Sequence, residues 1–174
     1  MSANNDKPRY YGKYRGTVML NIDPMLQGRL LVQVPEVLGV GVSSWAMPCL
    51  PLAGIQGGFF TIPPMQSGVW VEFEGGDSDY PIWVGGFWGS GAEVPVLAQA
   101  TPPALGVFVQ QTLAQNTMLL SDTPGPTGGF MIKTNSLGII SVSQAGIIIS
   151  NGQGASIAMI GPTVTINAGA LVIT

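Results

Sequence analysis

From residue 130 onward, hydrophobic and small residues alternate in a short, regular pattern. Gly138, Gly146, Gly154, Pro162 and Ala170 follow one another at steps of eight residues, and Phe130 starts the series. The runs between these positions are rich in valine, isoleucine and threonine. These residues favour strands, whereas glycine, asparagine and proline favour turns. Each octad therefore predicts one short strand followed by a turn, and a repeat of fixed period predicts a repetitive architecture.

An octad is too short to enclose a hydrophobic core by itself. Eight extended residues span at most about 26–29 Å, and a chain wrapping its own core would need three faces of about five to six residues each. We therefore predict that residues 116–174 form a trimeric, intertwined β-helix or β-prism, in which each chain supplies one face and passes to the next face at each corner. The side chains expected in the trimer core are Ile140, Val142, Ile148, Ile157, Val164 and Ile166.

An ordinary antiparallel sheet with turns every eight to twelve residues is the alternative interpretation of the same pattern. Asn151-Gly152 is its one candidate hairpin turn, and the apolar positions shift phase near residues 155–157. The regular recurrence of a small residue favours the trimeric interpretation.

The front half of the chain alternates apolar and polar residues between turn-forming segments. Strands are expected at residues 14–20, 29–35, 44–48, 69–73 and 82–86. Several short strands in so little chain favour a small closed barrel, because closure removes exposed edges. We expect an all-β protein with an N-terminal extension at 1–11, a barrel at 12–89, a connector at 90–115 and the octad region at 116–174.

Charge is sparse in the second half of the chain. From Pro81 onward only Glu93, Asp122 and Lys133 are charged, and 46% of all residues are hydrophobic. No apolar run approaches the 18 residues of a membrane helix, so we expect the apolar surface to be hidden in an oligomer. The net charge of −3 argues against a dedicated nucleic-acid binder.

An ordered set of motifs in the front half resembles a known family. The set includes Asn21-Ile22-Asp23-Pro24, Trp45-Ala46-Met47-Pro48 and Pro81-Ile82-Trp83-Val84-Gly85-Gly86, and it spans roughly residues 12–88. It is similar to the OB-fold domain of the phage baseplate assembly protein V family, which includes the gene-5-type spike of phage T4, VgrG spikes and the spikes of contractile injection particles. In that family a trimeric β-helix follows the OB fold.

The resemblance implies a structural central spike of a phage-tail-like baseplate, which joins a hub to a tip and pierces the target membrane when the sheath contracts. The chain has no muramidase-like insert after the barrel and no large hub domain before it, so we expect a separate hub protein like that of phage T4 and a separate tip protein of the PAAR type. The residues expected at the hub are Lys7, Arg9, Tyr10, Tyr11 and Lys13. Those expected to dock the tip are Leu171, Val172 and Ile173.

Two binding functions compete with this interpretation. Basic and aromatic residues before an OB barrel can bind single-stranded nucleic acid, although the acidic barrel strand around Glu72 would repel phosphates. Trp45, Trp70, Trp83 and Trp88 could form a carbohydrate platform, although Trp70 and Trp83 fall inside expected strands.

Enzymatic chemistry is not expected. The chain has no histidine, which excludes Ser-His-Asp and Cys-His nucleophile systems. Glu72 and Glu74 could form a glycosidase pair, but alternating carboxylates are more typical of the solvated face of a strand. The segment 77–79 matches only the start of a calcium loop, and no phosphate-binding motif occurs, so we expect no metal and no cofactor.

Two further expectations concern the environment of the chain. Cys49 lies among apolar residues and is expected to be a buried small residue. The first residues lack the hydrophobic segment of a signal peptide. We therefore expect synthesis in the cytoplasm and incorporation into a phage or phage-tail-like particle.

Overall fold

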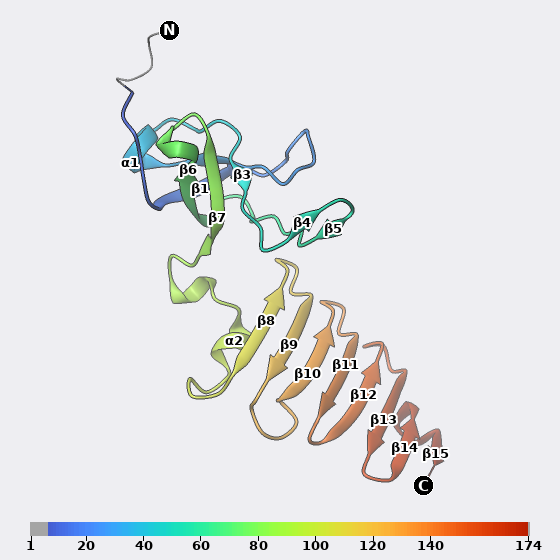
Figure 1. Cartoon of the computed structure of the whole chain (residues 1–174). Coiled ribbons are helices and arrows are strands. Elements are labelled where there is room, and N and C mark those ends of the chain that lie inside the picture. Colours follow the sequence, from blue (N-terminus) through green and yellow to red (C-terminus); the bar gives the residue numbers. More distant parts are fainter. Residues whose placement is uncertain (1–6, 174) are drawn as a thin grey trace. The chain divides into compact units, whose positions relative to one another are not determined.

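The computed structural model describes residues 7–173, without the side chains at positions 169 and 172. It separates into two compact units, Met1–Gly91 and Ala92–Thr174, each described here by itself (Figure 1). The first unit contains β1 (Tyr14–Leu20), β2 (Leu31–Gln33), α1 (Pro35–Leu38), β3 (Met47–Pro48), β4 (Ala53–Gly54), β5 (Gly57–Gly58), β6 (Gly68–Phe73), η1 (Glu74–Gly76) and β7 (Pro81–Phe87).

The second unit is built almost entirely of short strands. After η2 (Gly91–Glu93), which begins at the last residue of the first unit, its elements are α2 (Val96–Gln99), β8 (Val107–Gln111), β9 (Thr117–Ser121), β10 (Gly129–Lys133), β11 (Ile139–Ser143), β12 (Gly146–Ser150), β13 (Ser156–Ile160), β14 (Thr163–Ile166), η3 (Asn167–Gly169) and β15 (Leu171–Ile173). The expectation of an all-β protein is confirmed.

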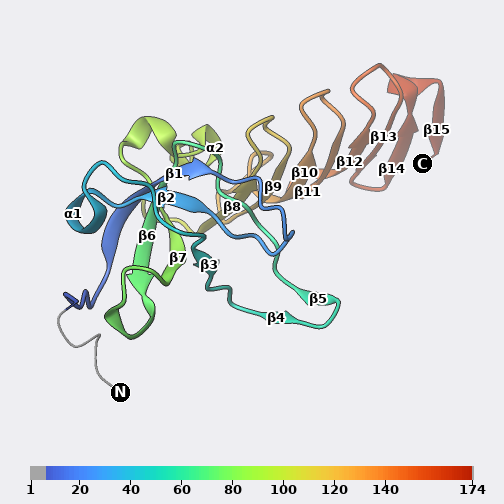
Figure 2. The same cartoon turned by 90° about the horizontal axis from the view of Figure 1, so that it is seen from above.

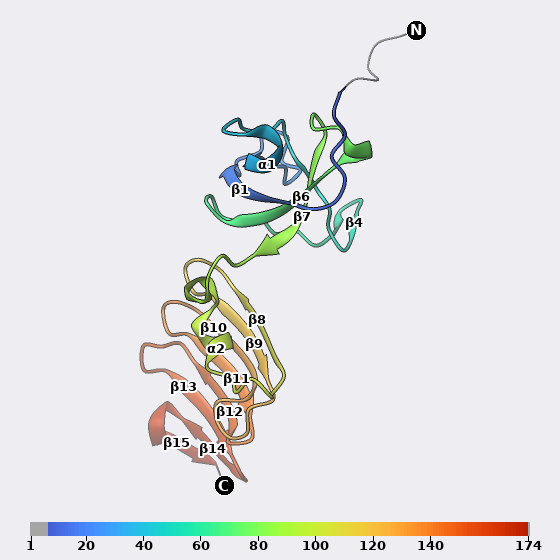
Figure 3. The ribbon, with the colours of Figure 1, turned by 90° about the vertical axis from the view of Figure 1, so that its left-hand side faces the viewer.

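The first unit is a curled sheet that closes on itself. Its strand order is β2-β1-β6-β7-β3, and Figure 3 shows the curvature of β1, β6 and β7. The segment before β3 returns to the chain around β2, because the backbones of Leu30 and Ala46 exchange two hydrogen bonds and Ser43 donates to the carbonyl of Val32. The sheet thereby becomes the small barrel that the strand pattern predicts.

The barrel core follows from strict alternation along β6. Val69, Val71 and Phe73 are buried, whereas Trp70 and Glu72 between them are only half-buried. The buried cluster is completed by Val18, Leu30, Val32, Val34, Ala46 and Trp83. The indole N–H of Trp83 donates to the carbonyl of Gly28 over 3.0 Å, so this large side chain is buried without losing a hydrogen bond.

The prediction for Cys49 is wrong, because its side chain is exposed. Its backbone N–H donates to the carbonyl of Trp83 at the point where β3 leaves the barrel. Met47, two residues earlier, is also exposed. The two side chains therefore point to the outer face of the strand, and apolar neighbours in sequence did not indicate burial.

The second unit is an antiparallel meander of eight strands in the order β15-β14-β13-β12-β11-β10-β9-β8 (Figure 1). Each strand pairs with the next one along the chain, as in the pairs of β11 with β12 and of β12 with β13. We expected the chain to pass to another face of the trimer at each corner. This part of the expectation is wrong, because consecutive strands pair with each other within one chain and form the antiparallel sheet that was the alternative interpretation. A β-prism made of three such sheets is consistent with this pairing.

The octad residues mark turns and tight contacts in this meander. Gly154 lies in the turn that follows Asn151, whose carboxamide oxygen accepts the backbone N–H groups of Gln153 and Ala155. Gly146 opens β12 with φ of +138°, and a Cβ there would lie 2.2 Å from the carbonyl oxygen of Met159. The connections alternate in length, with two residues between β11 and β12 and between β13 and β14, and five residues between β12 and β13. From Ile139 at the start of β11 to Ser156 at the start of β13 the chain advances by 17 residues, which is close to two octads.

The sheet begins earlier than expected. Strand β8 falls inside the range 90–115 that the composition assigned to a connector. Gly106 precedes β8 in phase with the octads, but Ala114 and Asp122 interrupt the series between Gly106 and Phe130, so the repeat pattern alone did not indicate β8. Within residues 7–173 no helix is long and apolar enough to cross a membrane.

Candidate functional site

One face of the eight-stranded sheet is almost entirely apolar. The register places Phe108, Leu120, Phe130, Val142, Ile147, Met159, Val164 and Ile173 in one row across the strands. A second row, on the same face, contains Gln110, Met118, Ile132, Ile140, Ile149, Ile157, Ile166 and Leu171. We call these two rows the apolar face, and Gln110 is its one polar member.

The apolar face is substantially open to solvent in the single chain. Phe108, Leu120, Ile140, Val142 and Ile149 are each more than two-fifths exposed. A contiguous apolar surface of this kind marks a contact with another protein surface. This face is therefore the main candidate for assembly.

The opposite face is mixed. Serine and threonine residues, including Ser141, Ser150 and Thr165, alternate there with apolar residues such as Met131 and Ile148. At its β8–β9 end this face is covered by the segment around α2, which lies against β8. The hydroxyls of Thr101 and Ser121 are 3.5 Å apart there, and Leu119 is buried. The two faces of the sheet thus differ clearly in polarity.

Five of the six residues expected in the trimer core lie together on the apolar face, and Ile148 does not. Ile148 pairs with Ser141 and Ala158 and so lies on the opposite face. The reason is the two-residue turn between Ser143 and Gly146, which form the last pair of the β11–β12 hairpin. Paired residues lie on the same face of a sheet, and a turn of two residues pairs the even-numbered residues of β11 with the odd-numbered residues of β12. Ile147 and Ile149 therefore lie on the apolar face.

The C-terminal strand is an edge of the sheet. Strand β15 pairs with β14, and no strand among residues 7–173 lies on its other side. Leu171 and Ile173 lie at the end of the apolar face and are more than half exposed. Of the three residues expected to dock a tip, Val172 falls on the other face by register, and its side chain is outside the described part of the chain.

The expected hub residues form a segment fastened to the turn after β6. The ammonium of Lys7 contacts the carboxylates of Asp77, at 3.0 Å, and of Asp79, and Arg9 lies 3.7 Å from the carboxylate of Asp77. The backbone N–H of Asp79 and the Lys7 ammonium hold the pKa of Asp77 below its ordinary value. Hydrogen bonds to Asp79 and Asp77 raise the pKa of Lys7.

The remaining expected hub residues differ in exposure. The ring of Tyr10 packs against those of Tyr14 and Phe73, with centroids 6.2 Å and 6.1 Å apart, and so belongs to the barrel. Tyr11 is 73% exposed. Lys13 forms an ion pair with Glu72. Of the five residues, Tyr11 and Lys13 are the most exposed, and the side chain of Arg9 is 44% exposed.

These ion pairs bear on the competing functions. Lys7, Arg9 and Lys13 face carboxylates of the barrel and do not form a free cationic surface. A phosphate backbone would have to displace those carboxylates, which weakens the nucleic-acid alternative. Because Glu72 is ion-paired on the outside of the barrel, a catalytic pair with Glu74 also has no support.

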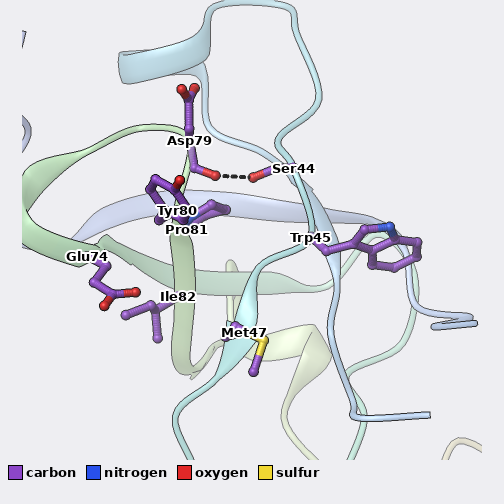
Figure 4. Close-up of a pocket in the computed structure, with 8 residues that line it drawn as sticks. All are labelled: Ser44, Trp45, Met47, Glu74, Asp79, Tyr80, Pro81 and Ile82. Atoms are coloured by element: carbon purple, nitrogen blue, oxygen red, sulfur yellow. Dashed lines mark hydrogen bonds between the residues drawn. The ribbon is translucent and has the colours of Figure 1, made fainter. Parts of the chain in front are cut away.

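A shallow pocket lies beside the same turn (Figure 4). Ser44, Trp45, Met47, Glu74, Asp79, Tyr80, Pro81 and Ile82 line it. The hydroxyl of Ser44 donates to the backbone carbonyl of Asp79 over 2.6 Å, so the polar groups are used to join two loops. The lining contains two carboxylates, Glu74 and Asp79, and the chain has no histidine to form a catalytic pair with either of them.

Asp23 is the most strongly held charged group that sequence reasoning did not single out as a site. Its carboxylate accepts hydrogen bonds from the guanidinium of Arg29, the shortest at 2.6 Å, and from the backbone N–H groups of Met25 and Gln27 at 2.9 Å. The Arg29 guanidinium, with these backbone donors, holds the pKa of Asp23 far below its ordinary range despite its burial. The Asn-x-Asp-Pro motif was the available signal, because aspartate commonly organises such turns.

Two family matches complete the picture. Residues 14–88 match the domain described as the type VI secretion system/phage-baseplate injector OB domain. Residues 107–172 match the phage baseplate V C-terminal trimerisation domain. No curated protein matches the chain. Because the two matches together span most of the chain, we conclude that it carries the OB domain and the trimerisation domain of the phage baseplate V proteins, a baseplate spike family, and is a structural protein without enzymatic activity.

Proposed function

We propose that this protein is the central spike of a phage or phage-tail-like injection baseplate, which joins a hub to a tip and pierces the target membrane when the sheath contracts. The observation that carries the proposal is the apolar face, an exposed surface that runs across all eight strands of a region matching a trimerisation domain. In a homotrimer, three such faces cover one another.

The proposed assembly is a β-prism. Each chain supplies one sheet, with the apolar face turned inward and the serine- and threonine-rich face turned to solvent. Burial of apolar surface contributes roughly 25 cal/mol per Å², and the two apolar rows of each of the three chains would make the assembly very stable. Continuous backbone hydrogen bonding along the sheet gives the prism the stiffness that a piercing element needs.

The N-terminal segment is the proposed hub contact. Its ion pairs with Asp77 and Asp79 hold residues 7–13 in a fixed course beside the turn after β6. A fixed segment loses little conformational entropy when it binds. Tyrosine and arginine are enriched at energetically important interface positions, so Tyr11 and Arg9 are its proposed anchors.

The C-terminal edge is the proposed tip contact. An open strand edge with apolar side chains is prone to unwanted pairing, and proteins normally cover it. Leu171 and Ile173 of three chains would present such an edge at one end of the prism. A tip protein of the PAAR type would cover both the side chains and the backbone groups.

The oligomeric state of the full-length protein tests the basis of this proposal. Light scattering coupled to size-exclusion chromatography is expected to give three times the 18.1 kDa chain mass. A folded monomer at micromolar concentration would refute the spike. Electron microscopy of the native particle, with an antibody against this chain, is then expected to label the centre of the baseplate.

A further inference from the structure

The OB unit has an exposed apolar surface of its own. No charged residue occurs between Glu36 and Glu72. This stretch includes residues 49–66, here called the arm, in which β4 and β5 form a small hairpin that extends from the barrel (Figure 2). Ile55 near its tip is fully exposed, and Phe60 is 71% exposed.

The two ends of the arm are anchored to the barrel, because Leu50 and Ile62 pack against the barrel core and the backbone N–H of Gln66 donates to the carbonyl of Val18. The hairpin between these ends is held by few backbone hydrogen bonds. Only Ala53 with Gly58 and Gly54 with Gly57 pair across the hairpin, and one further backbone bond joins Phe59 to Leu52. A two-stranded hairpin without a covered face is marginally stable in water. An uncharged hairpin with exposed isoleucine and phenylalanine is therefore expected to pack against a partner.

A rigid loop adjoins the base of the arm. Residues 21–29, here called the clamp loop, are fixed by the Asp23–Arg29 ion pair, and their Ile22, Met25 and Leu26 side chains are exposed. The carboxamide of Asn21 donates to the carbonyl of Pro63 at 3.0 Å. The clamp loop therefore presents three apolar side chains on a framework that is already ordered before binding.

The base of the arm lies against the clamp loop. Gly28 lies so close to the arm base that a Cβ there would be 3.1 Å from Ile62 and 3.5 Å from Phe60. A three-fold ring needs two different surfaces on each subunit, because its contacts run head to tail. The hairpin of the arm and the clamp loop at the base of the arm are two such surfaces.

We propose that the arm of one protomer packs on the clamp loop of the next, so that the OB units form their own ring of contacts around the three-fold axis. This inference rests on the proposed homotrimer. Association through residues 107–172 tethers three OB units at an effective concentration of roughly millimolar. At that concentration the identical neighbouring unit is the first apolar surface that the arm meets.

Cross-linking between differently labelled chains tests the contact. Chains carrying Ile55→Cys and chains carrying Met25→Cys, both with the exposed Cys49 changed to serine and with tags of different size, are co-expressed and treated with a short bismaleimide. Met25 serves because its side chain is exposed, whereas Leu26 has φ of +57° and tolerates replacement less well. The expected product is a covalent heterodimer on a denaturing gel.

The controls separate the inference from the proposed function. Trimers made of either single variant alone are expected to give at least tenfold less covalent dimer. A trimer by light scattering that gives no heterodimer would overturn the arm contact and leave the spike intact. A monomer by light scattering would contradict both the arm contact and the proposed spike.

A second variant distinguishes a neighbouring protomer from a hub as the occupant. Ile55→Ser with Phe60→Ser is expected to keep the trimer but to lower the unfolding temperature of the OB unit by several degrees in the purified protein. If that temperature is unchanged and only binding of the hub is lost, the arm belongs to the hub contact and the inference is wrong.

Discussion

At the level of single residues, Asp23 fixes the geometry of the clamp loop through its hydrogen bonds. Its pKa is lowered in the folded protein, so its carboxylate adds stability at pH values above its unfolded pKa of about 4. This contribution falls as the pH drops from about 4 towards the folded pKa. Asp23→Asn is therefore expected to lower the unfolding temperature of the OB unit at pH 7, and the difference from the unaltered protein should shrink at pH 3.

Thermal unfolding followed by circular dichroism at both pH values is the measurement. Asp79→Asn is a suitable control, because that side chain is largely exposed and an exposed ion pair contributes little. A difference for Asp23→Asn that is equal at pH 7 and pH 3 would show that the ionised carboxylate does not hold the loop.

Ile148 and Ile149 give a matched pair on one strand. They are 39% and 41% exposed in the single chain but lie on opposite faces of the sheet. Ile149→Asp is expected to break or severely weaken the trimer, because three unpaired carboxylates would be buried at about 3–5 kcal/mol each. Ile148→Asp is expected to leave the trimer intact, and light scattering of both variants is the check.

The same pair shows what sequence could not provide. A step of eight residues from Ile140 leads to Ile148. Because the turn after Ser143 has two residues, Ile140 pairs with Ile149 instead, and it is Ile149 that lies on the apolar face. Turn length sets the register of a hairpin, and the run Ile147-Ile148-Ile149 is apolar at every position. The hydrophobic pattern therefore identified the strand without identifying its face. Trimers formed equally well by both aspartate variants would mean that the apolar face is not the interface.

At the level of elements, alternation was a reliable guide where one face is buried. Strand β1 was predicted with the bounds that it has, and β6 and β7 each differ by a single residue at one or both ends. The weaker element is β2, which covers only the middle of the predicted 29–35, because Pro35 opens α1. The arm was not predicted, since Gly57-Gly58 indicated only a turn.

The N-terminal segment gives the next prediction. Arg9→Ala with Tyr11→Ala is expected to weaken hub binding by roughly 2 kcal/mol or more, since both are exposed interface anchors in the proposed spike. Tyr10 is left unchanged because its ring belongs to the barrel core. Co-purification with a tagged hub measures the effect, and light scattering confirms that the trimer persists.

Lys13→Ala is the control for this segment, because Lys13 is already paired with Glu72. Unchanged hub binding by the double variant would contradict the proposed contact. Tight binding of single-stranded DNA by the unaltered protein, weakened by added salt, would favour the nucleic-acid alternative instead.

At the level of the whole molecule, the sequence indicated an assembly but not its strand pairing. Sparse charge and octads too short to enclose a core both pointed to several chains. Consecutive octads can pair within one chain through hairpin turns, or each octad can pair with octads of the other chains. Glycine, asparagine and proline at the turns are compatible with both arrangements. Between the edge strands β8 and β15, the backbone of the sheet forms its hydrogen bonds within one chain. The side chains of the apolar face are therefore left to join the chains.

The far end of that sheet gives the last prediction. Val172→Lys with Ile173→Lys is expected to leave the trimer intact, because the seven strands before β15 still carry the apolar face. Three lysines at Ile173 would place positive charge at the apolar edge and repel an apolar partner surface, so the tip protein should be lost from purified particles. Ser156→Lys, on the face of β13 opposite the apolar face, is the matched control and should keep the tip. Mass spectrometry of the particles quantifies the tip, and a tip content equal to that of the control would exclude the C-terminal edge as its docking surface.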